Sequence, residues 1–208
     1  MNYLELKKIL PKKVNLLAVS KGFKSIDIEY IHSLGQNEFG ESKLQEALSK
    51  SIFKNNRDIH WHFIGRIQTN KIKKIVENFD FIHSVDSYKK LLKISNVALE
   101  IKKVKNIMIQ IKLSDDPEKG GMSYEELIEN WDQITKIKGI NVKGLMTINP
   151  KGLTSSQNFK LFRKCRSIAD DLNLPECSMG MSSDWEEAVE AGSTWLRLGS
   201  LIFGERFI

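Results

Sequence analysis

Short apolar runs and longer segments of helical period alternate strictly along this 208-residue chain, and this alternation is the strongest constraint on its fold. The short runs are rich in β-branched residues and predict strands, while the segments between them predict helices. The predicted strands are residues 14–19, 37–39, 61–64, 81–85, 106–112, 142–148, 176–179 and 194–198. The predicted helices are residues 26–34, 42–53, 69–78, 88–101, 124–137, 156–172 and 185–190.

Eight strands separated by helices require right-handed crossover connections and a parallel sheet covered by helices. Eight such units close naturally into a barrel rather than an open sheet. Barrels of this kind typically have ~250 residues, so a chain of 208 residues predicts short loops on both faces. No linker or low-complexity stretch marks a second domain. We therefore expect residues 1–208 to form a single α/β domain, a (β/α)8 TIM barrel.

Several predicted helices begin next to a residue that can accept hydrogen bonds from the first helical N–H groups. Ser25, Ser87 and Asp184 stand immediately before three of them. Ser123 is followed three residues later by Glu126, which is the spacing of a capping box. These residues support the predicted helix starts.

The composition argues against several classes of protein. No stretch is apolar enough to cross a bilayer and the N-terminus lacks a secretory signal, so we expect a cytoplasmic protein without membrane contact. The net charge of +6 comes from lysines interleaved with acidic residues. No aromatic stripe for stacking bases accompanies them, so nucleic acid is not an expected partner. Cys165 and Cys177 have no partner at metal-ligand spacing and are interpreted as packing residues.

Reactive and binding groups of such barrels lie in the loops that follow the strands. Lys21 directly follows the first predicted strand. After strands seven and eight, Gly180 with Ser182 and Gly199 with Ser200 supply small residues that expose backbone N–H groups. This pattern, with a helix start behind it, is typical of the phosphate sites of barrels. A phosphate site opposite a lysine indicates one small ligand that spans the mouth of the barrel.

Pyridoxal 5′-phosphate (PLP) is a ligand of this shape, because its ring carries an aldehyde that condenses with an amine and a phosphate at the other end. A lysine that forms the imine must be partly desolvated so that its amine becomes neutral, and a barrel mouth supplies that environment. Arg197 would lie beneath the ring and donate to the pyridine nitrogen. Because arginine keeps its proton, that nitrogen would stay unprotonated and the ring would be a weak electron sink. The alternative role for Arg197 is a salt bridge between a helix and the barrel.

Six motifs follow one another along nearly the whole chain, from about Leu16 to Arg206. They are Ala18-Val19-Ser20-Lys21; Phe39-Gly40-Glu41 with Gln45-Glu46; His60-Trp61-His62-Phe63-Ile64-Gly65 with Gln68-Thr69-Asn70-Lys71; Gly144-Leu145-Met146; Ser178-Met179-Gly180-Met181-Ser182; and Arg197-Leu198-Gly199-Ser200 with Ile202-Phe203-Gly204. In these motifs the sequence resembles the pyridoxal phosphate homeostasis protein family. The Ser-Met-Gly-Met-Ser and Trp-His-Phe-Ile-Gly strings are specific to that family.

The resemblance implies a barrel like the N-terminal domain of alanine racemase, PLP fold type III, with Lys21 as the Schiff-base lysine. It also implies that Ser182, Gly199 and Ser200 hold the phosphate and that Arg197 faces the pyridine nitrogen. Family members have no established turnover and are linked to buffering or delivery of PLP and to amino-acid and keto-acid balance. The expected role is therefore a non-catalytic PLP carrier, as a monomer or weak dimer, with PLP-requiring apo-enzymes as candidate recipients.

The resemblance also implies roles for three further residues. Met146 is expected near the ring of the cofactor. Ser42 stands where the family usually has asparagine, so the ring contact expected from that amide becomes shorter or water-mediated. Lys119 matches a lysine in a mobile loop of the family, and its role as a transient second amine for receiving or passing on the cofactor is a hypothesis. A solvated lysine in a flexible polar loop is the alternative.

Two other functions use the same barrel. An amino-acid racemase-type enzyme needs a base on each face of the substrate carbon, and racemases of this fold supply a tyrosine from a second domain. No tyrosine of this chain stands at the C-terminal end of a predicted strand; the four are Tyr3, Tyr30, Tyr88 and Tyr124. A phosphate-sugar enzyme would need carboxylates at several strand ends, where only Glu41 and Asp86 stand. The carrier is therefore favoured over both enzymes.

Three histidines invite a metal or general-base interpretation. His60 and His62 lie on one face of a predicted strand, but the sequence places no third ligand beside them, so zinc is not predicted. We expect His62 to lie inside the barrel with its hydrogen bonds satisfied. His83 is given no metal or catalytic role either.

Overall fold

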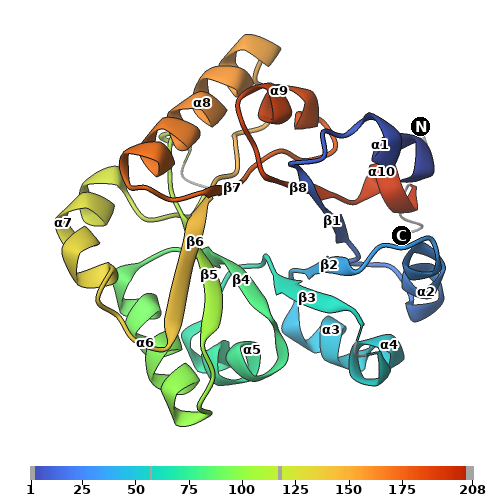
Figure 1. Cartoon of the computed structure of the whole chain (residues 1–208), viewed down its shortest axis with the longest axis horizontal. Helices are drawn as coiled ribbons and strands as arrows, with labels where there is room; N and C mark the ends of the chain where they lie inside the picture. The colour runs from blue at the N-terminus through green and yellow to red at the C-terminus, as the bar shows by residue number, and fades with distance from the viewer. Residues whose placement is uncertain (1–2, 57, 117–118, 205–208) are drawn as a thin grey trace.

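Eight parallel strands close into a barrel in the order in which they occur along the chain (Figure 1). The computed structural model describes residues 3–56, 58–116 and 119–204. Pairing between β1 and β8 closes the barrel, with Leu17 opposite Arg197. The strands are β1 (Asn15–Val19), β2 (Glu38–Glu41), β3 (His60–Phe63), β4 (Phe81–Val85), β5 (Lys105–Gln110), β6 (Ile140–Met146), β7 (Glu176–Ser178) and β8 (Trp195–Leu198).

Helices surround the barrel, so the predicted (β/α)8 architecture is confirmed (Figure 1). They are α1 (Tyr3–Ile9), α2 (Ser25–Ser33), α3 (Leu44–Ser49), α4 (Ser51–Asn55), α5 (Ile72–Asn78), α6 (Tyr88–Glu100), α7 (Tyr124–Ile134), α8 (Ser155–Asp171), α9 (Trp185–Glu190) and α10 (Ser200–Phe203), with a 3-10 turn, η1 (Thr69–Lys71), before α5. No helix in the described part of the chain has the length and apolarity of a membrane-spanning segment. Arg206, where the resemblance ends, lies outside the described residues.

Three features of the helices differ from the prediction. Helices α1 and α10 were not predicted, and the single helix predicted over residues 42–53 is two helices, α3 and α4. The break falls at Lys50, whose backbone is extended with φ −77° and ψ 128°. The side chain of Lys50 is buried and its Nζ donates to Ser20 O at 2.8 Å. Anchoring this amine beside the barrel accounts for the interruption.

The predicted helix caps are confirmed in part. The Ser123 Oγ accepts a hydrogen bond from the Glu126 N–H at 3.1 Å, as its spacing predicts. Ser87 precedes α6 and Asp184 precedes α9 without a side-chain cap bond. Ser25 is the first residue of α2 rather than its cap. Asp184 instead accepts from the Met181 N–H at 2.6 Å, so its carboxylate shapes the turn after β7.

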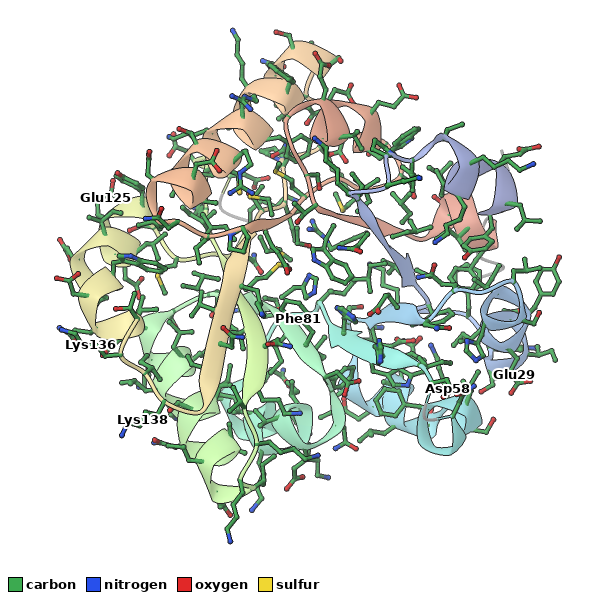
Figure 2. All side chains as sticks on the ribbon, viewed as in Figure 1. Glu29, Asp58, Phe81, Glu125, Lys136 and Lys138 are labelled. Carbon is green, nitrogen blue, oxygen red and sulfur yellow. The ribbon has the colours of Figure 1, made fainter. Side chains whose placement is uncertain are left out.

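Alternate residues of each strand face opposite sides of the barrel wall and produce two cores. The outward side chains pack against the helices in one large cluster. Inside the barrel, a smaller cluster contains Leu17, Phe81, Met108, Met146 and Trp195 (Figure 2 shows Phe81 at the barrel centre). Full burial of one such side chain contributes ~1.5–3 kcal/mol. The middle of the barrel is therefore a packed apolar layer beneath the loops at the strand ends.

Candidate functional site

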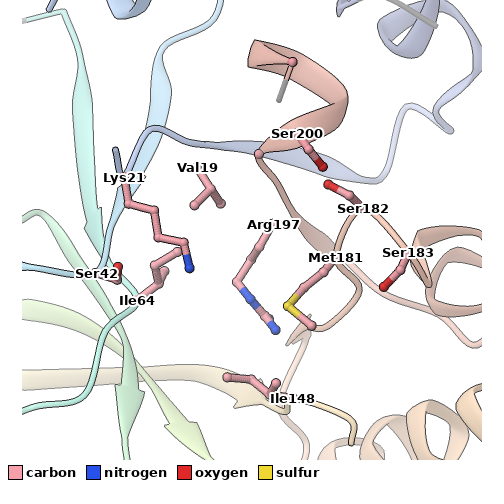
Figure 3. A pocket seen from close by; sticks show the side chains of 12 residues that line it. Val19, Lys21, Ser42, Ile64, Ile148, Met181, Ser182, Ser183, Arg197 and Ser200 are labelled. Atoms are coloured by element: carbon pink, nitrogen blue, oxygen red, sulfur yellow. The ribbon is translucent and has the colours of Figure 1, made fainter. Parts of the chain in front are cut away.

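A cavity of about 430 Å³ opens at the C-terminal ends of the strands, where barrels carry their binding groups. It brings together six of the seven predicted site residues, from the ends of β1, β2, β7 and β8 (Figure 3). These six are Lys21, Ser42, Ser182, Arg197, Gly199 and Ser200. The remaining lining residues are Val19, Ile64, Ile148, Met181, Ser183 and Gly204.

Lys21 follows β1, and its side chain projects into the cavity (Figure 3). The two residues that flank Lys21 in the sequence form hydrogen bonds with side chains from β2, from α3 and from Lys50, which follows α3. On one side, Ser20 Oγ donates to Glu41 Oε1 at 2.6 Å and Ser20 O accepts from Lys50. On the other side, the Gly22 N–H donates to the carboxylate of Glu46. These bonds fix the backbone from which the Lys21 amine extends.

The same bonds converge on a buried ion pair. Lys50 Nζ lies 2.5 Å from Glu41 Oε1 and 3.2 Å from Glu46 Oε1. Glu41 is fully buried, and burial raises the pKa of its carboxyl although Lys50 opposes the shift. The sequence identifies Glu41 as a strand-end carboxylate and as part of a family motif, but it does not indicate Lys50 as its partner. Lys50 falls inside the single helix predicted over residues 42–53, and a helical pattern gives no sign that its side chain is buried.

Hydroxyl groups lie across the cavity from Lys21. Ser182 and Ser183 belong to the turn after β7, and Ser200 begins α10 next to Gly199. The hydroxyls of Ser182 and Ser200 face each other in Figure 3. Because α10 has only four residues, hydroxyl and backbone N–H donors are a better basis for anion binding here than a helix dipole.

Gly180, expected at the phosphate, does not line the cavity. It is buried at φ +95°, and a Cβ there would lie 2.6 Å from Ala188 Cβ and 2.8 Å from Leu196 Cδ2. Its carbonyl accepts from the Arg197 N–H at 3.0 Å. Gly180 is therefore required for close packing of the turn after β7, and Ser182 two residues later faces the cavity.

Arg197 forms the inner wall of the cavity and is only 5% exposed. Its Nη1 donates to Ser178 O at 2.6 Å and to Ser178 Oγ at 2.8 Å, and its Nη2 donates to Thr147 O at 2.8 Å. All three acceptors are uncharged, and no carboxylate of the described residues lies within 4 Å of it, so the salt-bridge alternative is not supported. Burial lowers the pKa of Arg197 to about 10, which leaves the guanidinium protonated at neutral pH.

Met146 is the predicted site residue that lies outside the cavity. It is fully buried in the interior cluster with Leu17 and Trp195, one layer below the cavity. Ile148, two residues later, lines the cavity instead, and so does Met181. Alternation along the strand correctly predicts that Met146 faces inward, but the depth of the cavity decides which inward residue it exposes.

The structure confirms His62 as an interior residue with both ring nitrogens in hydrogen bonds. It lies 2.9 Å from His83 and 2.6 Å from Glu38, while His60 is largely exposed and lies 2.8 Å from the same Glu38 carboxylate. Within the described ranges, no three histidine, cysteine or acidic side chains are arranged to hold a metal ion. Cys165 and Cys177 are buried and unbridged, and the hydrogen bond between the two thiols together with burial raises the pKa of the Cys165 thiol.

Lys119 does not line the main cavity. Its backbone N–H donates to Asp116 O at 3.2 Å in the loop after β5. The next residue, Gly120, lines a second cavity of about 290 Å³ that shares Ile64 and Ile148 with the first. The loop of Lys119 therefore borders the space next to the main cavity.

Comparison with known proteins agrees with this geometry. Residues 1–207 match the family profile of the alanine racemase N-terminal domain. The pyridoxal phosphate homeostasis protein of Synechocystis sp. PCC 6803 is 42% identical over 211 residues, which cover 98% of this chain and 97% of that protein. The Escherichia coli K12 protein of the same name is 31% identical over 204 residues, covering 94% of this chain and 87% of that protein.

Solved structures give the same result. PipY from Synechococcus elongatus PCC7942, determined with PLP bound, superposes with a TM-score of 0.93 at 37% identity and 97% coverage of each chain. Alanine racemase of Clostridium difficile 630 superposes with a TM-score of 0.78 at 12% identity, covering 97% of this chain and 56% of the racemase, which shows a shared fold. The chain therefore belongs to the pyridoxal phosphate homeostasis protein family and has the barrel fold of the alanine racemase N-terminal domain.

Proposed function

We propose that this protein binds PLP through a Schiff base to Lys21 and acts in PLP homeostasis. One observation carries the proposal: an amine and a group of hydroxyls lie on opposite sides of a single cavity, with a buried guanidinium between them (Figure 3). The amine is that of Lys21, the hydroxyls are those of Ser182 and Ser200, and the guanidinium is that of Arg197. The relatives named for PLP homeostasis and PipY with bound PLP support the same ligand.

The residues of the cavity fit the chemistry of the cofactor. The volume of about 430 Å³ falls within the ~300–1,000 Å³ of small-ligand pockets. Ser182, Ser200 and the backbone N–H of Gly199 would hold the phosphate. Apolar contacts from Ile148 and Met181 would flank the ring, in place of the expected Met146. When bound, the cofactor supplies an aldehyde that condenses with an amine.

Arg197 gives the site the character of a carrier. Three of its N–H groups are used by Ser178 and Thr147, and the side chain still lines the cavity, so it can donate to a ring nitrogen. Arginine donates a hydrogen bond but keeps its proton, so the pyridine nitrogen that accepts the bond stays unprotonated. An unprotonated ring is a weaker electron sink. This property disfavours carbanion chemistry and favours simple holding of the cofactor.

The racemase alternative lacks a second base in the described cavity. None of the residues that line it is a tyrosine or a carboxylate. The proposed role is therefore buffering of PLP and its delivery to apo-enzymes, with effects on amino-acid and keto-acid balance. Residues 1–208 would act as one PLP-binding domain in the cytoplasm, as a monomer or weak dimer. Lys119 would serve as a second amine during delivery, and an unchanged rate of PLP transfer to an apo-enzyme in Lys119→Ala would remove that role.

An absorbance spectrum with PLP tests the proposal. The native protein is expected to show a band near the visible edge that borohydride removes, because borohydride reduces the imine between Lys21 and the cofactor. Lys21→Ala should lack that band. The matched control is Lys43→Ala, which removes an exposed lysine close to Ser42 but outside the main cavity and should retain it. A native protein without a borohydride-sensitive band contradicts the proposal.

A further inference from the structure

A continuous hydrogen-bonded chain crosses the barrel interior from the cavity to the opposite end of the barrel. Arg197 Nη1 lies 2.8 Å from Ser178 Oγ, which lies 3.0 Å from His83 Nδ1. His83 Nε2 lies 2.9 Å from His62 Nδ1, and His62 Nε2 lies 2.6 Å from Glu38 Oε2. The five residues come from β8, β7, β4, β3 and β2, and Glu38 is the first residue of its strand. The chain therefore connects the floor of the cavity with the N-terminal end of the barrel.

The donor and acceptor in each bond follow from the carboxylate of Glu38, which only accepts, so His62 donates to it from Nε2. A neutral His62 then accepts on Nδ1 from His83 Nε2, and a neutral His83 accepts on Nδ1 from the Ser178 hydroxyl. Arginine only donates, so Ser178 Oγ also accepts from Arg197. All four bonds point away from the cavity.

The surroundings of His83 favour its neutral form. Phe81 and Trp195 pack against His83 with ring centroids 4.5 and 5.7 Å away, and against His62 at 5.3 and 5.0 Å. Burial in this aromatic enclosure lowers the pKa of His83 well below its usual value, and the charge of Arg197 acts in the same direction. At the far end, partial burial opposes ionisation of Glu38, but hydrogen bonds from His62 and His60 lower its pKa overall. The chain therefore ends on a carboxylate.

We propose that Ser178 and His83 are positioning residues for Arg197. The one-directional hydrogen-bonded chain to Glu38 holds the guanidinium in the orientation in which it lines the cavity and can donate to a ligand there. The physical basis is the hydroxyl of Ser178, which can rotate. While His83 Nδ1 accepts its hydrogen, a lone pair of Oγ stays directed at Arg197 Nη1. Without that acceptor, the hydroxyl hydrogen can turn toward the guanidinium and weaken the bond. The effect on PLP binding rests on the proposed function, whereas the arrangement of protons does not.

Nitrogen NMR of the imidazoles tests the arrangement in the native, ligand-free protein at neutral pH. His62 and His83 are both expected to be neutral with the proton on Nε2. A proton on Nδ1 of either ring, or a doubly protonated ring, overturns the proposal. This measurement needs no variant and no cofactor, so it separates failure of the chain from failure of PLP binding.

PLP affinity tests the consequence for the site. His83→Gln is expected to raise the dissociation constant for PLP about tenfold, the size of one lost hydrogen bond to a charged group. Affinity for inorganic phosphate should stay within about twofold, because Ser182 and Ser200 do not depend on the chain. Unchanged PLP affinity, or equal losses for both ligands, overturns the positioning role.

Two further variants keep the test decisive. Ser178→Ala removes the hydroxyl but leaves the Ser178 carbonyl that Arg197 also binds, and it should give the same two results if His83→Gln does not fold. Glu176→Gln is the matched control, since Glu176 is an interior carboxylate that accepts from Trp195 Nε1 at 2.8 Å and lies outside the chain. Its PLP affinity should remain native, and a loss as large as that of Ser178→Ala would overturn the specific role of the chain.

Discussion

Lys21 illustrates how neighbouring residues give a common side chain a specific role. A lysine after a strand is usually solvated, but here Ser20 and Gly22 are both held by hydrogen bonds to buried or half-buried partners. The backbone at Lys21 is therefore constrained on both sides, and only the four-carbon side chain remains to be placed. Rigid support of this kind suits the covalent attachment of PLP that we propose at Lys21.

Ser182 provides the first prediction at the residue scale. Its hydroxyl faces that of Ser200 across the end of the cavity (Figure 3), so we assign it to the phosphate rather than to the ring. Ser182→Ala should weaken PLP binding by ~1.5–3 kcal/mol, the contribution of a hydrogen bond to a charged group. Binding of pyridoxal, which has no phosphate, should be unaffected. Equilibrium titration with both ligands measures the difference, and equal losses for both would contradict the assignment.

The individual site residues differ in how far the sequence predicts them. Lys21 and Ser42 follow strand ends, and order along the chain is enough to place them at the mouth of a barrel. Met146 shows the limit, because a sequence gives the inward face of a strand but not the depth at which a cavity ends. The roles of Ser178 and His83 depend on contact between strands 95 residues apart, which no local pattern contains.

At the scale of elements, alternation of strand and helix predicts the barrel, but the helix boundaries respond to tertiary contacts. The interval between β2 and β3 has a helical pattern throughout, yet it contains two helices because Lys50 leaves helical geometry and inserts its amine beside Glu41. Helical propensity is worth less than 1 kcal/mol per residue. A buried charge pair therefore overrides it at this position.

Lys50 carries the prediction at this scale. Lys50→Ala leaves the buried carboxylate of Glu41 without its cation and should lower the free energy of unfolding by ~3–5 kcal/mol. Replacing both partners, as Lys50→Met with Glu41→Leu, should recover most of that loss because no buried charge remains. Chemical denaturation measures each variant.

The matched control for Lys50 is Lys73→Ala. Lys73 also pairs with a carboxylate, that of Glu100 at 3.0 Å, but both side chains are more than half exposed. This variant should be as stable as the native protein. If Lys50→Ala were no more destabilising than Lys73→Ala, the buried pair would not hold the segment between α3 and α4.

At the scale of the whole molecule, the barrel interior joins an apolar layer to a polar chain. The apolar cluster around Leu17 and Met108 fills the barrel, while the chain from Arg197 to Glu38 passes through the same interior. The sequence predicts the closed barrel and an inward His62, because both depend on periodicity. It does not predict the hydrogen-bonded chain, because the five residues of that chain come from five different strands and meet only in the folded barrel. The same interior that stabilises the fold thereby supports the binding site.

This interior makes the stability of the molecule depend on pH. His83 has a pKa well below 6.5 in the folded protein, whereas in the unfolded chain it titrates near its ordinary value of ~6.5. Below that value the unfolded chain binds a proton that the folded protein does not bind, so the free energy of unfolding falls as pH falls. The contribution is fully present above ~6.5 and is lost at up to ~1.4 kcal/mol per pH unit below it.

Comparison with His83→Gln isolates this contribution. His60 acts in the opposite direction, because its hydrogen bond to Glu38 raises its pKa, and the carboxylates titrate at lower pH. These groups are shared by both proteins, so the difference between native and variant reports His83 alone. Denaturation between pH 7.5 and 5 should show the stability advantage of the native protein shrinking as pH falls. A His83→Gln curve that ran parallel to the native curve would mean that the buried imidazole is protonated equally in the folded and unfolded states.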